Sequence, residues 1–185
     1  MIVLPCYYLA PVSYYSALFR AKEGVLLEVN DRYRKQTFRN RCMIDSPQGA
    51  LALSIPVEKP APHALMRDIR ISDHGNWRHL HWNALLSSYR QSPFFEYYAD
   101  DFAPFYEKKW EFLADFNEDL LQLVCSLIDI DTPLSRTTAY AGELPEFPQV
   151  EKPYYQVFAR KHGFLQDLSI VDLLFNMGPE GMLWL

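Results

Sequence analysis

The chain has 185 residues, of which 49% are hydrophobic and 22% charged, the composition of an ordinary globular protein. Its length is that of one domain spanning residues 1–185, large enough to bury a core. The net charge of −5 argues against a nucleic-acid partner, and no apolar run reaches the roughly 18 residues of a membrane helix, so membrane insertion is not expected.

The number and spacing of the cysteines indicate the cellular compartment. Cys6, Cys42 and Cys125 are odd in number and lack CxxC spacing, so they indicate neither a disulfide framework nor a zinc site. The N-terminus has no basic segment or clear cleavage site of a secretory signal. We therefore expect a reduced, cytoplasmic protein without a bound metal. The sequence does not identify a cofactor or an oligomeric state.

The N-terminal segment predicts a strand, a helix and a second strand. Residues 2–11, "IVLPCYYLAP", read as a short strand that ends at a turn. Helical spacing of apolar residues predicts a helix over 12–22, and the apolar run at 24–29 predicts a buried strand. A strand–helix–strand unit favours a parallel pair with a right-handed crossover.

The middle of the chain predicts further strands and a helix. Alternation at 48–57 indicates a strand, 58–64 is a proline-rich loop, and 65–72 is a further candidate strand. Residues 76–90 have apolar side chains on one face and predict a helix.

The C-terminal half is expected to be mostly helical. Ser92 and Pro93 resemble an N-cap and a first helical residue. Ser169 or Asp167 is a candidate cap for the last helix, which Gly178-Pro179 is expected to stop. Helices are predicted at 93–107, 109–128 and 168–176, and a long connection at 131–153. The fold class is therefore α/β: a small parallel or mixed sheet flanked by helices, with a mostly helical C-terminal half.

No motif for phosphate binding by a glycine-rich loop is present. The chain has only seven glycines, and none of them forms GxGxxG or GxxxxGK[ST]. GxSxG, HExxH and CxxC are absent as well. If an anionic ligand binds this chain, side chains must therefore supply much of the binding.

A basic stretch stands out in this acidic chain. Five of the 18 cations fall within ten residues: Arg32, Arg34, Lys35, Arg39 and Arg41. Laid out as a strand, the stretch would place Lys35, Arg39 and Arg41 on one face. Arginine suits bidentate contact with phosphate or carboxylate, so Lys35, Arg39, Asn40 and Arg41 are candidate ligand-binding residues. The alternatives are a solvated loop, or ion pairs with acids elsewhere in the chain.

Two further stretches offer candidate catalytic residues. On a helix His79 and His81 lie about 200° apart and cannot share one metal ion. His81 is a candidate general base, with Tyr89 two turns further along; the alternative is a structural histidine. Tyr97 is a candidate cleft residue because buried phenols need partners. Asp172 and Asn176 are expected on the surface of the last helix.

The order of these segments resembles the WbqC-like family of bacterial proteins. The resemblance is carried by "YYLAPVSYYSAL" (7–18), "YRKQTFRNRCMI" (33–44), "LALSIPV" (51–57), "WRHLHWNALLSSYRQSPFFEYYADDFAPFYEKK" (77–109) and "YYQVFARKHGFLQDLSIVDLLFNMGPE" (154–180). Many family members have a His-Gln-Pro run ahead of a "YLP" turn. This chain has "VLPCYYLAP" there, so any role of that histidine is absent.

The resemblance implies a role in bacterial surface chemistry. The family is associated with gene clusters for O-antigen and other surface polysaccharides, and transfer of glycine or another aminoacyl group to an amino sugar has been proposed for some members. It has no settled catalytic residues to carry over.

The resulting hypothesis is an aminoacyl or acyl transferase acting on a nucleotide-linked amino sugar. Lys35, Arg39 and Arg41 would hold the phosphates of an anionic small molecule, a nucleotide sugar or an acyl donor. His81 would accept a proton, and Tyr89 or Tyr97 would orient the substrate. The alternatives are another nucleotide-dependent α/β enzyme, such as a nucleotidylyltransferase, and a non-catalytic binding or assembly protein. Residues 5–15 lack the paired histidines expected of a nucleotidylyltransferase.

Overall fold

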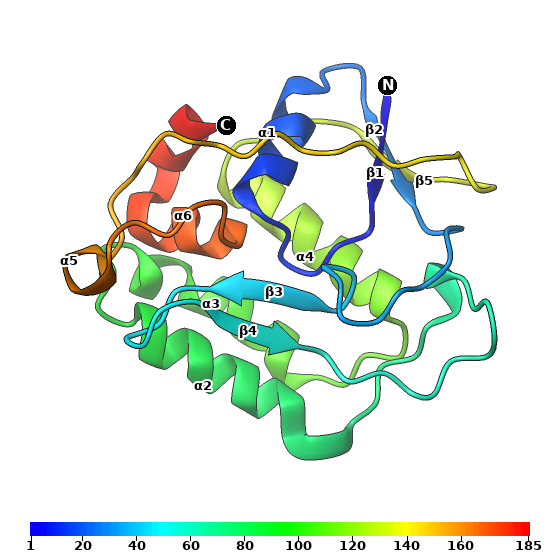
Figure 1. Cartoon of the computed structure of the whole chain (residues 1–185), viewed down its shortest axis with the longest axis horizontal. Coiled ribbons are helices and arrows are strands. Elements are labelled where there is room, and N and C mark those ends of the chain that lie inside the picture. Colours follow the sequence, from blue (N-terminus) through cyan, green and yellow to red (C-terminus); the bar gives the residue numbers. More distant parts are fainter.

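A small parallel sheet forms one side of the protein in the computed structural model, which describes all 185 residues (Figure 1). Its strands are β1 (Ile2–Pro5), β2 (Val25–Glu28) and β5 (Leu134–Arg136), in the order β1-β2-β5. Both pairs are parallel, with Ile2 opposite Val25 and Val25 opposite Leu134. Helix α1 (Val12–Arg20) joins β1 to β2, which confirms the predicted strand–helix–strand unit and its parallel pair. Strand β5 lies inside the segment that we expected to be a connection.

A separate antiparallel pair lies against the helices. It consists of β3 (Arg41–Ile44) and β4 (Leu51–Ser54), with Arg41 opposite Ser54. The intervening turn is closed by the Ser46 hydroxyl, which donates to the carbonyl of Gly49 over 2.7 Å. Strand β4 falls within the predicted strand at 48–57. The predicted strand at 65–72 is wrong: Met66–Asp68 is a 3₁₀ helix, flanked by isolated bridges only.

The helices of the C-terminal half are present as the fold class predicts. They are α2 (Trp77–Tyr89), α3 (Phe95–Glu107), α4 (Leu113–Leu127), the short α5 (Ala159–His162) and α6 (Ile170–Met177), with 3₁₀ helices at His74–Asn76 and Gly178–Trp184. The predicted start of α3 is wrong, because the helix begins at Phe95. The Ser92 hydroxyl donates instead to the carbonyl of Tyr89, 2.6 Å away, at the end of α2.

The ends of α6 follow the sequence signals closely. Ser169 is the N-cap, with its hydroxyl accepting from the backbone N–H of Val171 over 3.4 Å. Gly178 ends the helix with φ 59°, and a Cβ at this position would lie 2.5 Å from the ring of Phe94. Glycine is therefore required at this position both for its backbone conformation and for the close approach of the ring.

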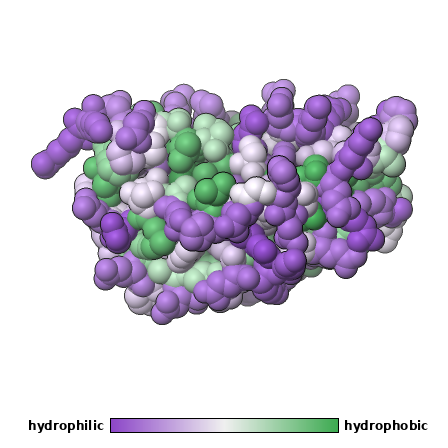
Figure 2. Space-filling view, turned by 90° about the horizontal axis from the view of Figure 1, so that it is seen from below, coloured by the Kyte–Doolittle hydropathy of each residue, from purple (hydrophilic) through white to green (hydrophobic).

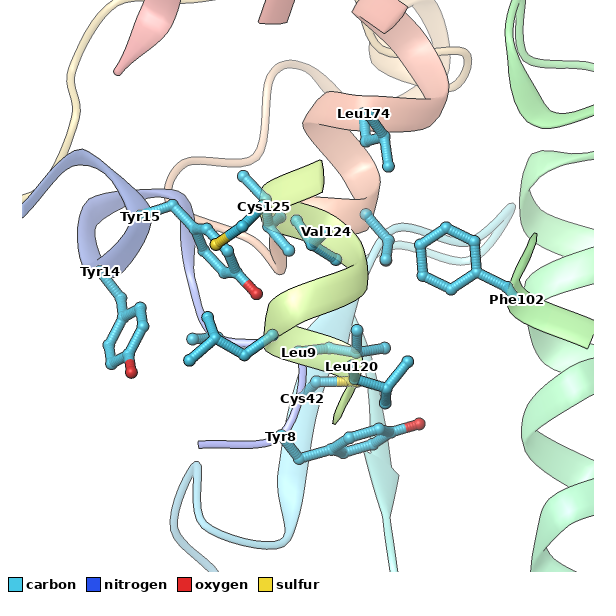
Figure 3. Close-up of a cluster of buried hydrophobic side chains, with 14 of the residues drawn as sticks. Tyr8, Leu9, Tyr14, Tyr15, Cys42, Phe102, Leu120, Val124, Cys125 and Leu174 are labelled. Carbon is cyan, nitrogen blue, oxygen red and sulfur yellow. The ribbon is translucent and has the colours of Figure 1, made fainter. Parts of the chain in front are cut away.

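The hydrophobic core surrounds α4. Figure 3 shows Val124 and Cys125 of α4 between Tyr15 of α1 and Phe102 of α3, with Leu174 of α6 above them. Each of these side chains is at most 6% exposed. Full burial of a large apolar side chain contributes about 1.5–3 kcal/mol, so these contacts hold the helical half against α1. All three cysteines are free thiols inside the protein.

The outer face on the α2 side is mixed in character. Figure 2 views the molecule from below and shows small apolar patches separated by hydrophilic side chains. None of the helices combines the length and the apolar character needed to cross a membrane.

A buried carboxylate, that of Asp172, connects α6 to two other segments, the end of α2 and residues 154–156. Its Oδ1 accepts from the Tyr89 hydroxyl over 2.7 Å, and its Oδ2 accepts from the Tyr154 hydroxyl over 2.6 Å and from Gln156 Nε2 over 2.8 Å. The expectation that Asp172 and Asn176 lie on the surface is wrong, because α6 is enclosed and these residues are 0% and 3% exposed. Burial raises the pKa of Asp172 to about 6, against the lowering effect of its hydrogen-bond donors.

Replacing Asp172 by Asn should flatten the dependence of stability on pH. Because the pKa of this carboxyl is raised from 3.8 to about 6 on folding, the folded state binds the proton more tightly than the unfolded chain. The tighter proton binding contributes about 3 kcal/mol to the free energy of unfolding. This contribution is fully present below about pH 4 and is lost as the pH rises through about 6.

Urea titrations of the wild type and Asp172→Asn at pH values from about 4 to 7 measure this difference. The exposed Asp131→Asn is the matched control and should retain the wild-type profile. Parallel profiles for the wild type and Asp172→Asn would contradict the assignment, whatever constant loss the missing hydrogen bonds cause.

Candidate functional site

A cleft of about 700 Å³ opens where the three parallel strands end. We call it the arginine cleft. Its walls are Tyr7, which follows β1; residues 30–32, Arg34 and Arg39, which follow β2; residues 140 and 143–145, which follow β5; and Leu65. The carboxyl ends of parallel strands are the usual ligand site in open α/β sheets. The cleft therefore lies where this architecture normally binds a small molecule.

The ion pair between Arg39 and Asp31 forms the buried floor of the charged part of the cleft lining. Both side chains are less than 10% exposed, and Nε and Nη2 of Arg39 both donate to Asp31 Oδ2, the former over 3.1 Å. From α4, Asn117 Nδ2 donates to the carbonyl of Arg39 over 2.8 Å. Burial raises the pKa of Asp31, although Arg39 opposes the shift. Asp31 thus offsets much of the charge of Arg39.

The uncompensated positive charge of the cleft comes from Arg32 and Arg34. Both are exposed, and neither makes an ion pair within the chain. Tyr7 is half-buried beside them, with its ring centroid 5.9 Å from the Arg39 guanidinium carbon. Such a combination of free guanidinium groups and an aromatic wall suits a phosphate or carboxylate that is attached to a planar or sugar-like group.

The predicted strand geometry of the basic stretch is wrong. Residues 35–40 form turns: the Thr37 hydroxyl donates to the carbonyl of Arg34 over 2.7 Å, and Asn40 N–H donates to the carbonyl of Thr37 over 3.2 Å. Gln36 has φ 60°, in the left-handed region, which a strand does not allow. Lys35, Arg39 and Arg41 therefore do not share a strand face.

Of the five predicted ligand-binding residues, Arg39 alone lines the arginine cleft. Asn40 is buried and donates to the carbonyl of Ile55 over 3.0 Å, while Arg41 Nε donates to the Ser54 hydroxyl on β4 over 3.0 Å. Lys35 is exposed in a turn, and Tyr97 is 72% exposed on α3. Ligand contacts by these four residues stay predictions.

His81 lies in the aromatic core with both ring nitrogens engaged. Nε2 donates to the carbonyl of Ser54 over 3.1 Å, so Nδ1 accepts from the Tyr8 hydroxyl over 2.9 Å. The Tyr8 hydroxyl also contacts that of Tyr106 at 2.9 Å. Burial lowers the pKa of His81 to about 4, which keeps the ring neutral at pH 7.

Tyr89 is also buried and lines no part of the arginine cleft. Its hydroxyl donates to Asp172 and accepts from the backbone N–H of Asp45 over 3.1 Å. The structure thus places the two predicted catalytic residues, His81 and Tyr89, in the core rather than among the cleft residues. Their catalytic roles stay predictions.

Glu28, at the end of β2, joins the walls of the cleft. It is 0% exposed, and its Oε1 accepts from the N–H of Asn30 over 2.7 Å and from the Thr137 hydroxyl over 2.8 Å. Its Oε2 accepts from the N–H of Ala141 over 2.8 Å. One buried carboxylate therefore ties the end of β2 to the segment after β5 and positions the wall that contains Tyr140 and Glu143.

The sequence analysis did not select most of the cleft residues, although some of them carried a recognisable signal. Asn30 and Asp31 directly follow the apolar run of β2, and polar residues that follow a buried parallel strand are a signal for the ligand edge of a sheet. Tyr140 and Glu143 carried no comparable signal, because the three-residue strand β5 that precedes them is too short to recognise. No three His, Cys, Asp or Glu side chains are grouped so as to hold a metal ion.

The fold and the cleft define a small α/β protein with a cation-lined site at the carboxyl edge of a parallel sheet. The WbqC-like protein family matches residues 6–145, and the chain belongs to this family. A similar protein is "Uncharacterized protein Rv1507c" of Mycobacterium tuberculosis (strain ATCC 25618 / H37Rv), 34% identical over 192 aligned residues; the match covers 80% of this chain and 81% of that protein. No solved structure matches the chain.

Replacing Glu28 by Gln should loosen the cleft wall. The amide presents a donor where the carboxylate accepts, so at least one buried N–H or hydroxyl loses its partner, at about 1–3 kcal/mol. Chemical denaturation measures the loss, and hydrogen exchange of the Ala141 amide should speed up. Glu143→Gln, on the exposed part of the wall, is the control and should stay within about 0.5 kcal/mol. Unchanged stability of Glu28→Gln would contradict the role of Glu28 in joining the end of β2 to the segment after β5.

Replacing His81 by Phe should destabilise the core by about 1–3 kcal/mol, because the carbonyl of Ser54 and the hydroxyl of Tyr8 each lose a partner. His79→Phe, on the exposed face of the same helix, is the matched control with an expected change below about 0.5 kcal/mol. Equal stability of the two variants in thermal unfolding would show that His81 has no structural role.

Proposed function

We propose that the arginine cleft binds the phosphates of a nucleotide-linked amino sugar, and that the protein transfers an acyl or aminoacyl group, such as glycine, to its amine. The observation that carries the proposal is the meeting of Arg32, Arg34 and Arg39 on one cavity at the carboxyl ends of parallel strands. Two free guanidinium groups replace the glycine-rich phosphate loop that the sequence lacks. Family membership supports a setting in O-antigen or other surface polysaccharide synthesis.

The cleft suits the rest of such a ligand as well. Its volume of about 700 Å³ lies within the range usual for small-molecule sites. Tyr7 and Tyr140 line it and offer aromatic faces to a base or a sugar ring. The three free thiols support a cytoplasmic location, where nucleotide-linked sugars would be accessible.

The reaction proposed is an acyl transfer from a thioester or ester donor. The amine nitrogen of the sugar attacks the carbonyl carbon, forming a C–N bond, and the C–S or C–O bond to the leaving group breaks. The nitrogen loses one proton, and the leaving group takes up one. Binding the acceptor by its phosphates positions the amine for attack, and such orientation is a large part of catalysis of two-substrate reactions.

A nucleotidylyltransferase is the second candidate, because a cleft at the end of a β1-α1-β2 unit is also where such an enzyme would bind its nucleotide. Magnesium-dependent binding of ATP or CTP in calorimetry would favour it. The third candidate is a non-catalytic binding protein of polysaccharide synthesis, which would bind nucleotide sugars without turnover. Mass spectrometry of the acceptor, incubated with the protein and candidate acyl donors, would then show no acylated product.

Replacing Arg34 by Gln should weaken binding of a nucleoside diphosphate by about tenfold, because one charge-assisted phosphate contact is lost. Isothermal titration calorimetry measures the affinity. Lys35→Gln removes the same charge one residue further on, outside the cleft lining, and is the matched control with an expected change below about twofold. An equal loss in both variants would mean that net charge, rather than the cleft, governs binding. A loss in Lys35→Gln alone would move the site to the predicted Lys35 contact.

A further inference from the structure

The arginine cleft contains carboxylates as well as guanidinium groups. Asp31 and Glu143 line it together with Arg32, Arg34 and Arg39. Glu143 is exposed and makes no ion pair within the chain. A site for a purely anionic ligand gains nothing from acids in its wall, because like charges placed opposite each other lower affinity.

Asp31 is placed to contact a ligand as well as Arg39. Both hydrogen bonds from Arg39 go to Oδ2 of Asp31, which leaves Oδ1 without a side-chain partner. The carboxylate is held in place on this oxygen, because the Arg39 guanidinium donates to Oδ2 and Asn117 of α4 donates to the Arg39 carbonyl. A carboxylate that is held on one oxygen and has no side-chain donor on the other, inside a cleft, is an acceptor for a cationic group.

We infer that Asp31 Oδ1 binds the amino group of the ligand, so that the cleft selects a phosphate ester carrying a free primary amine over its N-acylated form. This inference rests on the proposed function, since it concerns the same cleft and the same ligand. Arg32 and Arg34 bind the phosphates, and Asp31 binds the ammonium group. The mixed charge of the wall then matches the mixed charge of the ligand.

The same contact would serve the transfer step. An amine attacks a carbonyl only after it has lost its extra proton, and a carboxylate hydrogen-bonded to the nitrogen accepts protons from it. Burial raises the pKa of Asp31, which makes the carboxylate a better proton acceptor than an exposed aspartate. After acylation the nitrogen is an uncharged amide, so the product loses its ion pair with Asp31 and is released.

The test compares three probes by calorimetry: a nucleoside diphosphate, a nucleotide-linked amino sugar with a free amine, and its N-acetylated counterpart. In the wild type we expect the free amine to bind about tenfold more tightly than the N-acetylated form, the value of one charge-assisted contact. In Asp31→Asn this preference should fall to about one, while the affinity for the nucleoside diphosphate changes less than about threefold. Glu146→Gln, which removes an exposed carboxylate outside the cleft lining, is the matched control and should keep the preference.

Asp31→Asn leaves the buried Arg39 without its partner, and this variant can therefore fail to fold. The double variant Asp31→Asn/Arg39→Gln removes both charges, and it should likewise lose the amine preference. Two results would overturn the inference and leave the proposed function standing. One is a wild type that binds the nucleoside diphosphate but shows no preference for the free amine; the other is a preference that survives in either Asp31 variant. No binding of any probe by the wild type would overturn both.

Discussion

The arginine cleft depends on the buried carboxylate of Glu28. A carboxylate at 0% exposure without a cation partner is stable only if hydrogen bonds replace its hydration, and here three donors from two strand ends do so. The consequence is geometric. The segment after β5 is held beside the end of β2, and this places Tyr140 and Glu143 in the cleft wall. The strands of the sheet are short, and the hydrogen bonds of Glu28 add contacts between β2 and the segment after β5 beyond the strand pairing.

Two other buried carboxylates show how differently the protein uses the same group. Both oxygens of Asp172 accept hydrogen bonds from the side chains of Tyr89, Tyr154 and Gln156, and these bonds join α6 to the rest of the core. Asp31 has side-chain donors on one oxygen only and lies in the wall of a cleft. A carboxylate with donors on both oxygens stabilises a fold, whereas one with an oxygen that lacks a side-chain donor is available to a ligand.

Elements with strong local signals were predictable, and those that depend on distant partners were not. The β1-α1-β2 unit, α2, α4 and the Ser169 cap follow from apolar periodicity and capping chemistry, which act over a few residues. Strand β5 is three residues long and exists because it pairs with β2, more than 100 residues earlier in the chain. Lys35, Arg39 and Arg41 are spaced as residues on one face of a strand would be. The left-handed backbone at Gln36 instead makes the stretch a loop, in which Arg39 pairs with Asp31.

By itself the sequence determined the α/β class, the family and the presence of a cation-rich segment without a glycine-rich phosphate loop, because composition, periodicity and motifs are local properties. Only the tertiary structure decided which cations face a common cavity. It brought Arg32 and Arg34 there and left Lys35 in an exposed turn. It also placed His81 in an aromatic core with both nitrogens bonded. Side-chain surroundings depend on segments far apart in the chain, and a single sequence does not record how those segments pack.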